Sequence, residues 1–212
     1  MKSKDSSKSK IRILQAAEKL FAEKGFDAAR VDDIAEKAGV NKALIYYYFK
    51  SKRDVLDQLF NNLVEELLKV VHDSLEQHAN FESVEDMAQE LGAYYDFMES
   101  KEDTIRIMMM ESLKGSEGSP PLFKLSELTT GEAGEEIMKM FEERGISVDV
   151  DMDEARIGDF FTGMIPMLNF IVYRHDWSKH FGIDPAELKQ KFFRIFRITH
   201  LAYHKVQQEE ME

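Results

Sequence analysis

The sequence contains no cysteine, and this absence excludes several kinds of chemistry at once. Without a thiol there are no disulfide bonds, no thiolate zinc sites and no cysteine nucleophile. A chain without disulfides must be held together by its packed core, and its 212 residues are enough for one or two domains. The lack of cysteine suits a reducing compartment, so we expect a cytoplasmic protein.

The sequence also lacks any long apolar run. The first apolar cluster, residues 11–21, is interrupted by the charged side chains of Arg12, Glu18 and Lys19. A signal peptide or a membrane-spanning helix needs a run without such charges. We therefore expect a soluble protein that has no membrane partner.

Basic residues are fewer than acidic ones, and the net charge of −12 by itself disfavours a polyanionic partner. Residues 1–53 nevertheless carry 13 Lys and Arg against 7 Asp and Glu, a surplus of +6, whereas residues 54–212 carry −18. Residues 1–10 are rich in Lys and Ser, and we expect them to be a disordered basic tail; without them the surplus is still +3. This asymmetry is typical of a chain in which one small region faces phosphates.

No run of four or more residues alternates as a strand would, and helical periodicity dominates. The sequence therefore predicts an all-α fold. Gly25 ends the first apolar stripe, and Asp184-Pro185 gives the last helix an N-cap followed by a proline at its first position. The predicted helices cover residues 8–24, 31–38, 42–48, 52–78, 83–99, 102–114, 121–143, 152–175 and 185–206.

Catalytic and metal-binding patterns are incomplete wherever they begin. The alternating acidic residues from Asp149 to Asp153 have the spacing of a calcium loop, but Phe160 stands where the bidentate glutamate is required. His200 and His204 lie one turn apart, but no nearby carboxylate completes a metal site in the sequence. Neither a phosphate-binding glycine loop nor a nucleophile elbow is present. We expect no enzymatic activity, no cofactor and no metal.

Residues 31–45 have the steric plan of two helices that cross steeply through a tight turn. Ala35 is small where the two helices approach, and Gly39 can adopt the positive φ that the turn needs. Apolar side chains such as Ile34 fill the crossing. The pattern favours a helix-turn-helix, although an ordinary helical hairpin with an alanine and a glycine also fits it.

The next residues favour nucleic acid as the partner. Three consecutive tyrosines, residues 46–48, are followed by the basic residues Lys50, Lys52 and Arg53. Consecutive residues on a helix point about 100° apart, so three rings cannot share one buried stripe. At least one phenol must therefore face outward, where it can donate to a phosphate oxygen, with Lys52 beside the same phosphates. The alternative is that all three tyrosines belong to the core or its rim.

A set of short motifs carries a resemblance to a known family. These motifs are Ile13-Leu14, Ala16-Ala17, Leu20-Phe21, Gly25-Phe26, Val31-Asp-Asp-Ile-Ala, Ala38-Gly39-Val40, Ile45-Tyr46-Tyr47-Tyr48-Phe49 and Lys52. From about Ile13 to Leu56 the sequence resembles the TetR family. The resemblance implies a three-helix DNA-binding head with a helix-turn-helix at residues 11–51, followed by a helical effector-binding and dimerisation bundle at residues 52–212.

The resemblance also implies which residues contact DNA. The helix at residues 42–48 would lie in the major groove, with Lys42, Ala43 and Leu44 near the bases. Leu44 is apolar, so it would read a thymine methyl group. The expected phosphate contacts are Arg30, Tyr46, Tyr47, Tyr48 and Lys52. Ser or Thr usually caps the helix that begins near Val31; here Ala29-Arg30 stands at that place, so only a longer-range charge from Arg30 replaces the missing hydroxyl.

The expected function is that of a homodimeric, sequence-specific regulator, most simply a repressor that a small molecule releases from double-stranded operator DNA. A Met- and Phe-rich space would bind an apolar or aromatic effector, with the lining Phe97, Met108, Met109, Phe161, Met164 and Phe170. The resemblance implies a dimer seam on the last two long helices, with Phe192, Ile195, Phe196, Thr199 and Tyr203. Two alternatives remain: simple core packing of the Met and Phe residues, and a helical ligand-binding or scaffold protein with a degenerate head.

Overall fold

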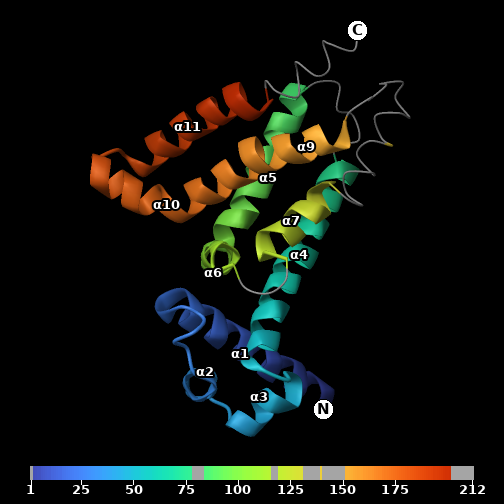
Figure 1. The fold of residues 1–212 in the computed structure, drawn as a ribbon, viewed down its shortest axis with the longest axis vertical. Helices are drawn as coiled ribbons and strands as arrows, with labels where there is room; N and C mark the ends of the chain where they lie inside the picture. The colour runs from blue at the N-terminus through green and yellow to red at the C-terminus, as the bar shows by residue number, and fades with distance from the viewer. Residues whose placement is uncertain (1, 78–83, 116–118, 131–138, 140–150, 202–212) are drawn as a thin grey trace. The chain divides into compact units, whose positions relative to one another are not determined.

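The structure is a computed structural model that describes residues 2–77, 84–115, 119–130, 139 and 151–201 (Figure 1). The regular elements in these ranges are all helical, which confirms the all-α prediction. The chain forms two compact units. The first unit comprises residues 1–65 and 103–122, and the second unit comprises residues 66–102 and 123–212. Within the described ranges, no helix combines the length and the apolar character needed to cross a bilayer.

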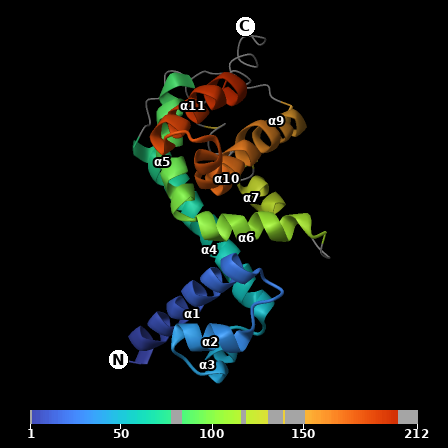
Figure 2. The same cartoon turned by 90° about the vertical axis from the view of Figure 1, so that its left-hand side faces the viewer.

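The first unit begins with three helices that form the head (Figure 2). They are α1 (Lys2–Lys24), α2 (Val31–Ala38) and α3 (Lys42–Tyr48). Helix α1 packs against both α2 and α3. One side of α1 carries an apolar stripe, and this packing buries it: Ile13, Ala17 and Phe21 are each 0% exposed.

Helix α1 is longer than predicted, because it begins at Lys2 rather than near Lys8. Residues 2–10 are therefore helical in the structure, where we expected a disordered tail. The stretch contains neither glycine nor proline, and Lys and Ser lower helix stability only slightly. Nothing in this stretch stops the helix from continuing toward the N-terminus.

The first unit also contains the start of α4 (Lys52–Gln77) and most of α6 (Glu102–Leu113). In α6 the apolar side chains of Ile105, Ile107 and Met108 are buried. The resemblance places the end of the DNA-binding domain at Ser51. The first compact unit extends beyond this residue, as far as Glu65. Helix α4 is one continuous helix that belongs to both units.

The second unit is made of the remaining helices. They are α5 (Val84–Ser100), most of α7 (Pro121–Thr130), α9 (Met152–Gly158), η1 (Asp159–Met164), α10 (Ile165–Phe181), α11 (Pro185–Phe196) and η2 (Arg197–Leu201). Its core is aromatic: the fully buried Tyr95 contacts the rings of Phe170 and Phe193 with centroids 6.1 and 5.1 Å apart. Arg174 on α10 binds Glu99 at 3.0 Å and Glu102 at 2.9 Å. These contacts fix α10 and α11 against α5.

Helices α9 and α10 form one helical run that is interrupted by the π-helical segment η1. Pro166 lies in the first turn of α10, and its ring nitrogen cannot donate to the preceding turn. A wider turn just before a proline accommodates this loss. The ring of His200 in η2 packs on η1, with its Nδ1 atom 2.9 Å from the Thr162 hydroxyl and its Nε2 atom 2.7 Å from where a Cβ would stand on Gly163.

Candidate nucleic-acid interface

The turn between α2 and α3 depends on Gly39. This residue has φ 64° and ψ 41°, a left-handed conformation that is unfavourable for residues with a Cβ. Its conformation lets the Val40 backbone N–H donate to the carbonyl of Ala35 at 3.0 Å, which closes α2. A Cβ here would meet only the Arg12 guanidinium, 3.9 Å away, so the backbone rather than crowding requires glycine. The prediction of a positive φ at Gly39 is confirmed.

Helix α3 begins at a side-chain cap that the sequence reasoning did not identify. The Oδ1 atom of Asn41 accepts a hydrogen bond from the backbone N–H of Leu44 at 2.8 Å. Asparagine is among the preferred N-cap residues, so its position before an apolar helix was an available signal. The cap fixes where the seven-residue helix begins, and with it the positions of all its side chains.

Only one face of α3 is anchored. Ile45 is 1% exposed and holds the helix against the core, whereas Lys42 and Ala43 are exposed and Leu44 is half-buried. The three residues that we expect near the bases therefore lie on or close to the outer surface of the head. Figure 2 shows α2 and α3 together at one end of the first unit.

Two of the three tyrosines also face outward. Tyr46 is 50% exposed and Tyr47 is 77% exposed, while Tyr48 is half-buried. The ring of Tyr48 lies between those of Tyr47 and Phe49, with centroids 5.0 and 6.4 Å away. This arrangement is what the 100° spacing requires, and it leaves at least two phenols accessible to a partner.

Lys52 occupies a different place from the one expected. Its Nζ atom donates to the backbone carbonyls of Phe26 at 2.6 Å, Ala29 at 2.9 Å and Asp27 at 3.2 Å. It also lies 4.4 Å from the centroid of the Phe26 ring. An ammonium has three N–H donors, and these carbonyls account for all of them. In this structure Lys52 therefore binds the loop between α1 and α2 and has no donor left for a phosphate.

The same loop is bound from α6. The Nζ atom of Lys114, which directly follows α6, lies 2.7 Å from the Asp27 carboxylate and 2.5 Å from that of the buried Glu111. The hydrogen bond from Lys114 lowers the pKa of Asp27, and the pKa of Lys114 is raised by the bonds to Asp27 and Glu111. The loop is thus held through a carboxylate as well as through its carbonyls.

Arg30 stands at the N-cap position of α2, in an extended conformation with φ −101° and ψ 149°. Its side chain makes no capping bond, as expected for arginine, and it is exposed. Asp32 and Asp33 follow in the first turn, where carboxylates interact favourably with the helix dipole. Lys42 lies 2.9 Å from Asp32, and this hydrogen bond raises the pKa of Lys42.

The sequence of the head decides the family. Residues 13–59 match the family model described as "Bacterial regulatory proteins, tetR family". The chain belongs to the TetR family. It is 27% identical over 192 residues to IcaR of Staphylococcus aureus, a negative transcriptional regulator of the biofilm operon icaADBC, covering 89% of this chain and 97% of IcaR. It is 33% identical over 95 residues to YhgD of Bacillus subtilis, an uncharacterized HTH-type transcriptional regulator, and this match spans 45% of the chain and about half, 49%, of YhgD.

Solved structures share the fold of this TetR-family protein. The fatty acid degradation regulator FadR from Bacillus halodurans is 22% identical with a TM-score of 0.61, covering 89% of this chain and 94% of that one. FadR from Bacillus subtilis, solved in complex with stearoyl-CoA, is 19% identical with a TM-score of 0.61, covering 88% and 96%. The protein is thus a DNA-binding transcriptional regulator with a helix-turn-helix head and a further helical unit.

By compactness, the six residues expected to line the effector pocket are divided between the two units of the chain. Met108 and Met109 belong to the first unit, whereas Phe97, Phe161, Met164 and Phe170 belong to the second. Phe161 is 64% exposed, and the ring of Phe170 stacks on that of Phe192 at 3.9 Å. Composition identified apolar side chains but not whether they face one another.

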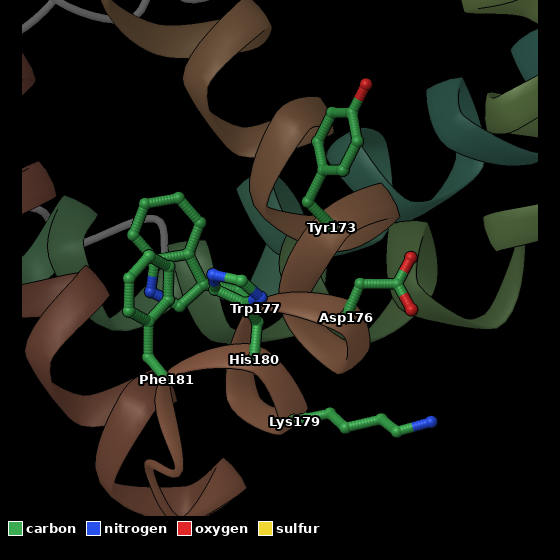
Figure 3. A pocket seen from close by; sticks show the side chains of 6 residues that line it. All are labelled: Tyr173, Asp176, Trp177, Lys179, His180 and Phe181. Carbon is green, nitrogen blue, oxygen red and sulfur yellow. The ribbon is translucent and has the colours of Figure 1, made fainter.

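A hollow among the described residues lies on the C-terminal half of α10 (Figure 3). It is open, has a volume of about 630 Å³, and is lined by Tyr173, Asp176, Trp177, Lys179, His180 and Phe181. None of these residues was among the six expected ones. The aromatic rings form a patch, with the centroids of Trp177 and Phe181 4.6 Å apart.

The residues expected at the dimer seam differ in how they pack within one chain. Phe196 is only 3% exposed, and Phe192 is half-buried against Phe170, so both belong to the core of their own second unit. Ile195 and Thr199 are exposed, and Tyr203 lies outside the described residues. Helical spacing alone did not show which of these residues pack against α10. The large apolar side chains left exposed on these last helices are Tyr173, Trp177, Phe181, Ile195 and Ile198.

Proposed function

We propose that this protein is a repressor that binds a palindromic operator as a homodimer and leaves it when a small apolar molecule binds the second unit. The observation that supports this most directly is the geometry of α3. One side of the helix is anchored by Ile45, and the rest presents Lys42, Ala43 and the phenols of Tyr46 and Tyr47 to the exterior. A helix anchored in this way can enter a groove without unfolding the head.

The dimensions of α3 suit the major groove. An α-helix with its side chains is about 10–12 Å in diameter, and the major groove of B-form DNA is about 12 Å wide. We assign base contacts to Lys42, Ala43 and Leu44. The phenols of Tyr46, Tyr47 and Tyr48 and the guanidinium of Arg30 would contact phosphates, which fixes the position of α3 along the duplex.

The dimer interface would be formed by α10 and α11. Tyr173, Trp177 and Phe181 repeat every four residues on α10 and are exposed, and Ile195 on α11 and Ile198 on η2 are exposed as well; exposed apolar surface of this kind marks interaction sites. A two-fold axis would pair each patch with its own copy and present two heads to two half-sites about one helical turn apart. We therefore assign the dimer contact to Tyr173, Trp177, Phe181, Ile195 and Ile198, in place of the expected set.

An apolar effector is supported by the composition of the second unit. Its helices carry Phe97, Met164 and Phe170, and Met and Phe side chains adapt readily to apolar ligands. FadR of Bacillus subtilis carries stearoyl-CoA in its structure, and IcaR is a negative regulator. Helix α4 runs without interruption from Lys52 in the first unit to Gln77 in the second. An effector-induced change in the second unit would therefore reach the head through a continuous helix.

The proposal is tested by selecting DNA from a random pool with the full-length protein and measuring the binding of the selected sequence. We expect a palindrome that is bound by two chains. Tyr47→Ala should weaken binding roughly uniformly across sequences, because a phosphate contact carries no sequence information. Phe123→Ala, which likewise removes an exposed ring but from α7, is the matched control. If the pool yields no enriched sequence, the alternative of a ligand-binding or scaffold protein with a degenerate head takes its place.

A further inference from the structure

An ion pair joins the two helices of the helix-turn-helix at their exposed ends. Lys42 is the first residue of α3, and its Nζ atom lies 2.9 Å from Oδ1 and 3.0 Å from Oδ2 of Asp32, in the first turn of α2. The side chains are 49% and 68% exposed. One ammonium is thus shared between both oxygens of a carboxylate on the surface that carries the exposed Tyr46.

Stability alone does not explain this pair. An ion pair that is exposed on both sides contributes little to folding, because water screens it and two long side chains must be ordered. Asp32 also places a negative charge on the surface that the proposed function turns toward phosphates. The neighbouring Asp33 makes a similar exposed pair, but with Lys24 of α1 rather than with a residue of α3. Asp32 beside Lys42 thus places an acceptor and a donor side by side at the start of α3.

A guanine–cytosine pair has that pattern in the major groove. Guanine presents two adjacent acceptors, N7 and O6, and cytosine presents the N4 amino donor beyond them. An ammonium can bind the two guanine acceptors while a neighbouring carboxylate accepts from the cytosine amino group. In an adenine–thymine pair the amino donor separates the two acceptors, and the thymine methyl group occupies the outer edge. An adjacent lysine and aspartate therefore match guanine–cytosine better.

We propose that Asp32 and Lys42 together read one guanine–cytosine pair in each half-site, with Asp32 accepting from cytosine N4 and Lys42 donating to guanine N7 and O6. This rests on the proposed function, since it requires that α3 lie in the major groove. It adds a specificity-determining residue from α2 to the set on α3. Asp32 was not among the residues that the resemblance placed near DNA.

The Asp32–Lys42 pair discriminates between base pairs by disfavouring the wrong ones as well as by binding the right one. When a cytosine–guanine or an adenine–thymine pair occupies the position, the carboxylate of Asp32 faces a carbonyl oxygen that cannot donate to it, and a desolvated charge is left without a partner. In a thymine–adenine pair the adenine amino group can still donate to Asp32, but the methyl group replaces the N7 acceptor of Lys42. Asp32 also weakens binding to the phosphates of any sequence. An ammonium has three N–H donors, so Lys42 must release one of its two contacts with Asp32 to donate to both guanine acceptors, and the other contact keeps the two side chains together.

The test is selection from a random DNA pool with the full-length wild type and three variants. Asp32→Asn and Lys42→Met each remove one member of the pair. Asp33→Asn is the matched control, because it changes the charge equally one residue away while leaving the pair intact. We expect the wild type to prefer guanine–cytosine at one position of each half-site by about tenfold to a hundredfold. Both pair variants should lose most of that preference at that same position, and the control should keep it.

Two outcomes would overturn the inference. The first is that Asp32→Asn keeps the wild-type sequence preference and only binds all DNA more tightly, which would make Asp32 a general repulsive charge. The second is that Asp32→Asn and Lys42→Met alter different, separate positions. A wild type that selects no sequence would instead refute the proposed function itself. Failure of the base-pair assignment can therefore be distinguished from failure of DNA binding.

Discussion

Replacing Lys52 by methionine removes the cation that holds the loop between α1 and α2 and keeps most of the aliphatic side chain. The substitution leaves three backbone carbonyls without their donor, and one of them belongs to Ala29, a residue that is only 1% exposed. The carbonyls of Phe26 and Asp27 are better placed to bind water instead. The loss should therefore be concentrated at Ala29.

The magnitude follows from these contacts. A hydrogen bond to a charged group contributes about 1.5–3 kcal/mol, a buried carbonyl left unpaired costs about 1–3 kcal/mol, and contributions from one ammonium are not additive. We expect Lys52→Met to lower the free energy of unfolding of the first unit by about 2–4 kcal/mol. For a chain of this length the corresponding fall in Tm is roughly 5–15 °C.

Circular dichroism during thermal unfolding of the full-length protein measures this change, with Lys50→Met as the control, because Lys50 is exposed and loses the same charge two residues away. The slope of log K against log salt for the selected DNA is measured in parallel. Since Lys52 has no free donor, Lys52→Met should leave this slope unchanged, whereas losing a phosphate contact would reduce it by about 0.9. An unchanged Tm together with a reduced slope would refute the loop-binding role and restore the phosphate contact.

Three other substitutions test other parts of the molecule. Trp177→Glu should convert the dimer to monomers in sedimentation experiments, whereas Trp177→Phe should not, and a dimer that survives the glutamate would exclude this surface as the interface. Gly163→Ala should lower the unfolding free energy of the second unit by about 1–3 kcal/mol, because its Cβ would stand 2.6 Å from the His200 ring; an unaltered melting curve would show that the ring moves freely. Asp27→Asn should be less stable than the wild type above the ordinary pKa of 3.8, and the difference should vanish as the pH falls through the lowered pKa of Asp27; a difference that is independent of pH would show that the carboxylate's charge is not responsible.

The head was predicted well because the signals for it are local. The bounds of α2 and α3 agree with the predicted ranges, because residues next to the helices set their ends. Gly39 supplies the left-handed turn, and the period of the apolar residues places Ile45 in the core. Such features depend on residues within one or two turns of each other, which a sequence displays directly.

The contacts that the sequence does not show have a different physical origin. Lys52 binds backbone carbonyls 23 to 26 residues earlier in the chain, and no side-chain pattern shows where a carbonyl points. The helical spacing that includes Phe196 is the same whether this side chain packs within one chain or between two chains. The tyrosines gave correct exposure because three consecutive rings cannot be buried on any helix, whereas the effector residues required knowledge of which helices face one another.

The π-helical turn η1 has a consequence for the proposed dimer. A π turn holds one residue more than an α turn, so it shifts the angular phase of everything that follows by about 100°. Tyr173, Trp177 and Phe181 all follow η1 on the same helical run. Deleting a single residue from η1 would restore a regular α-helix. The three rings would then point in a different direction relative to the side chains of α9. The number of residues in this one turn therefore sets the direction in which the aromatic stripe of α10 faces. A gain or loss of one residue there would be enough to change which partner this helix can bind.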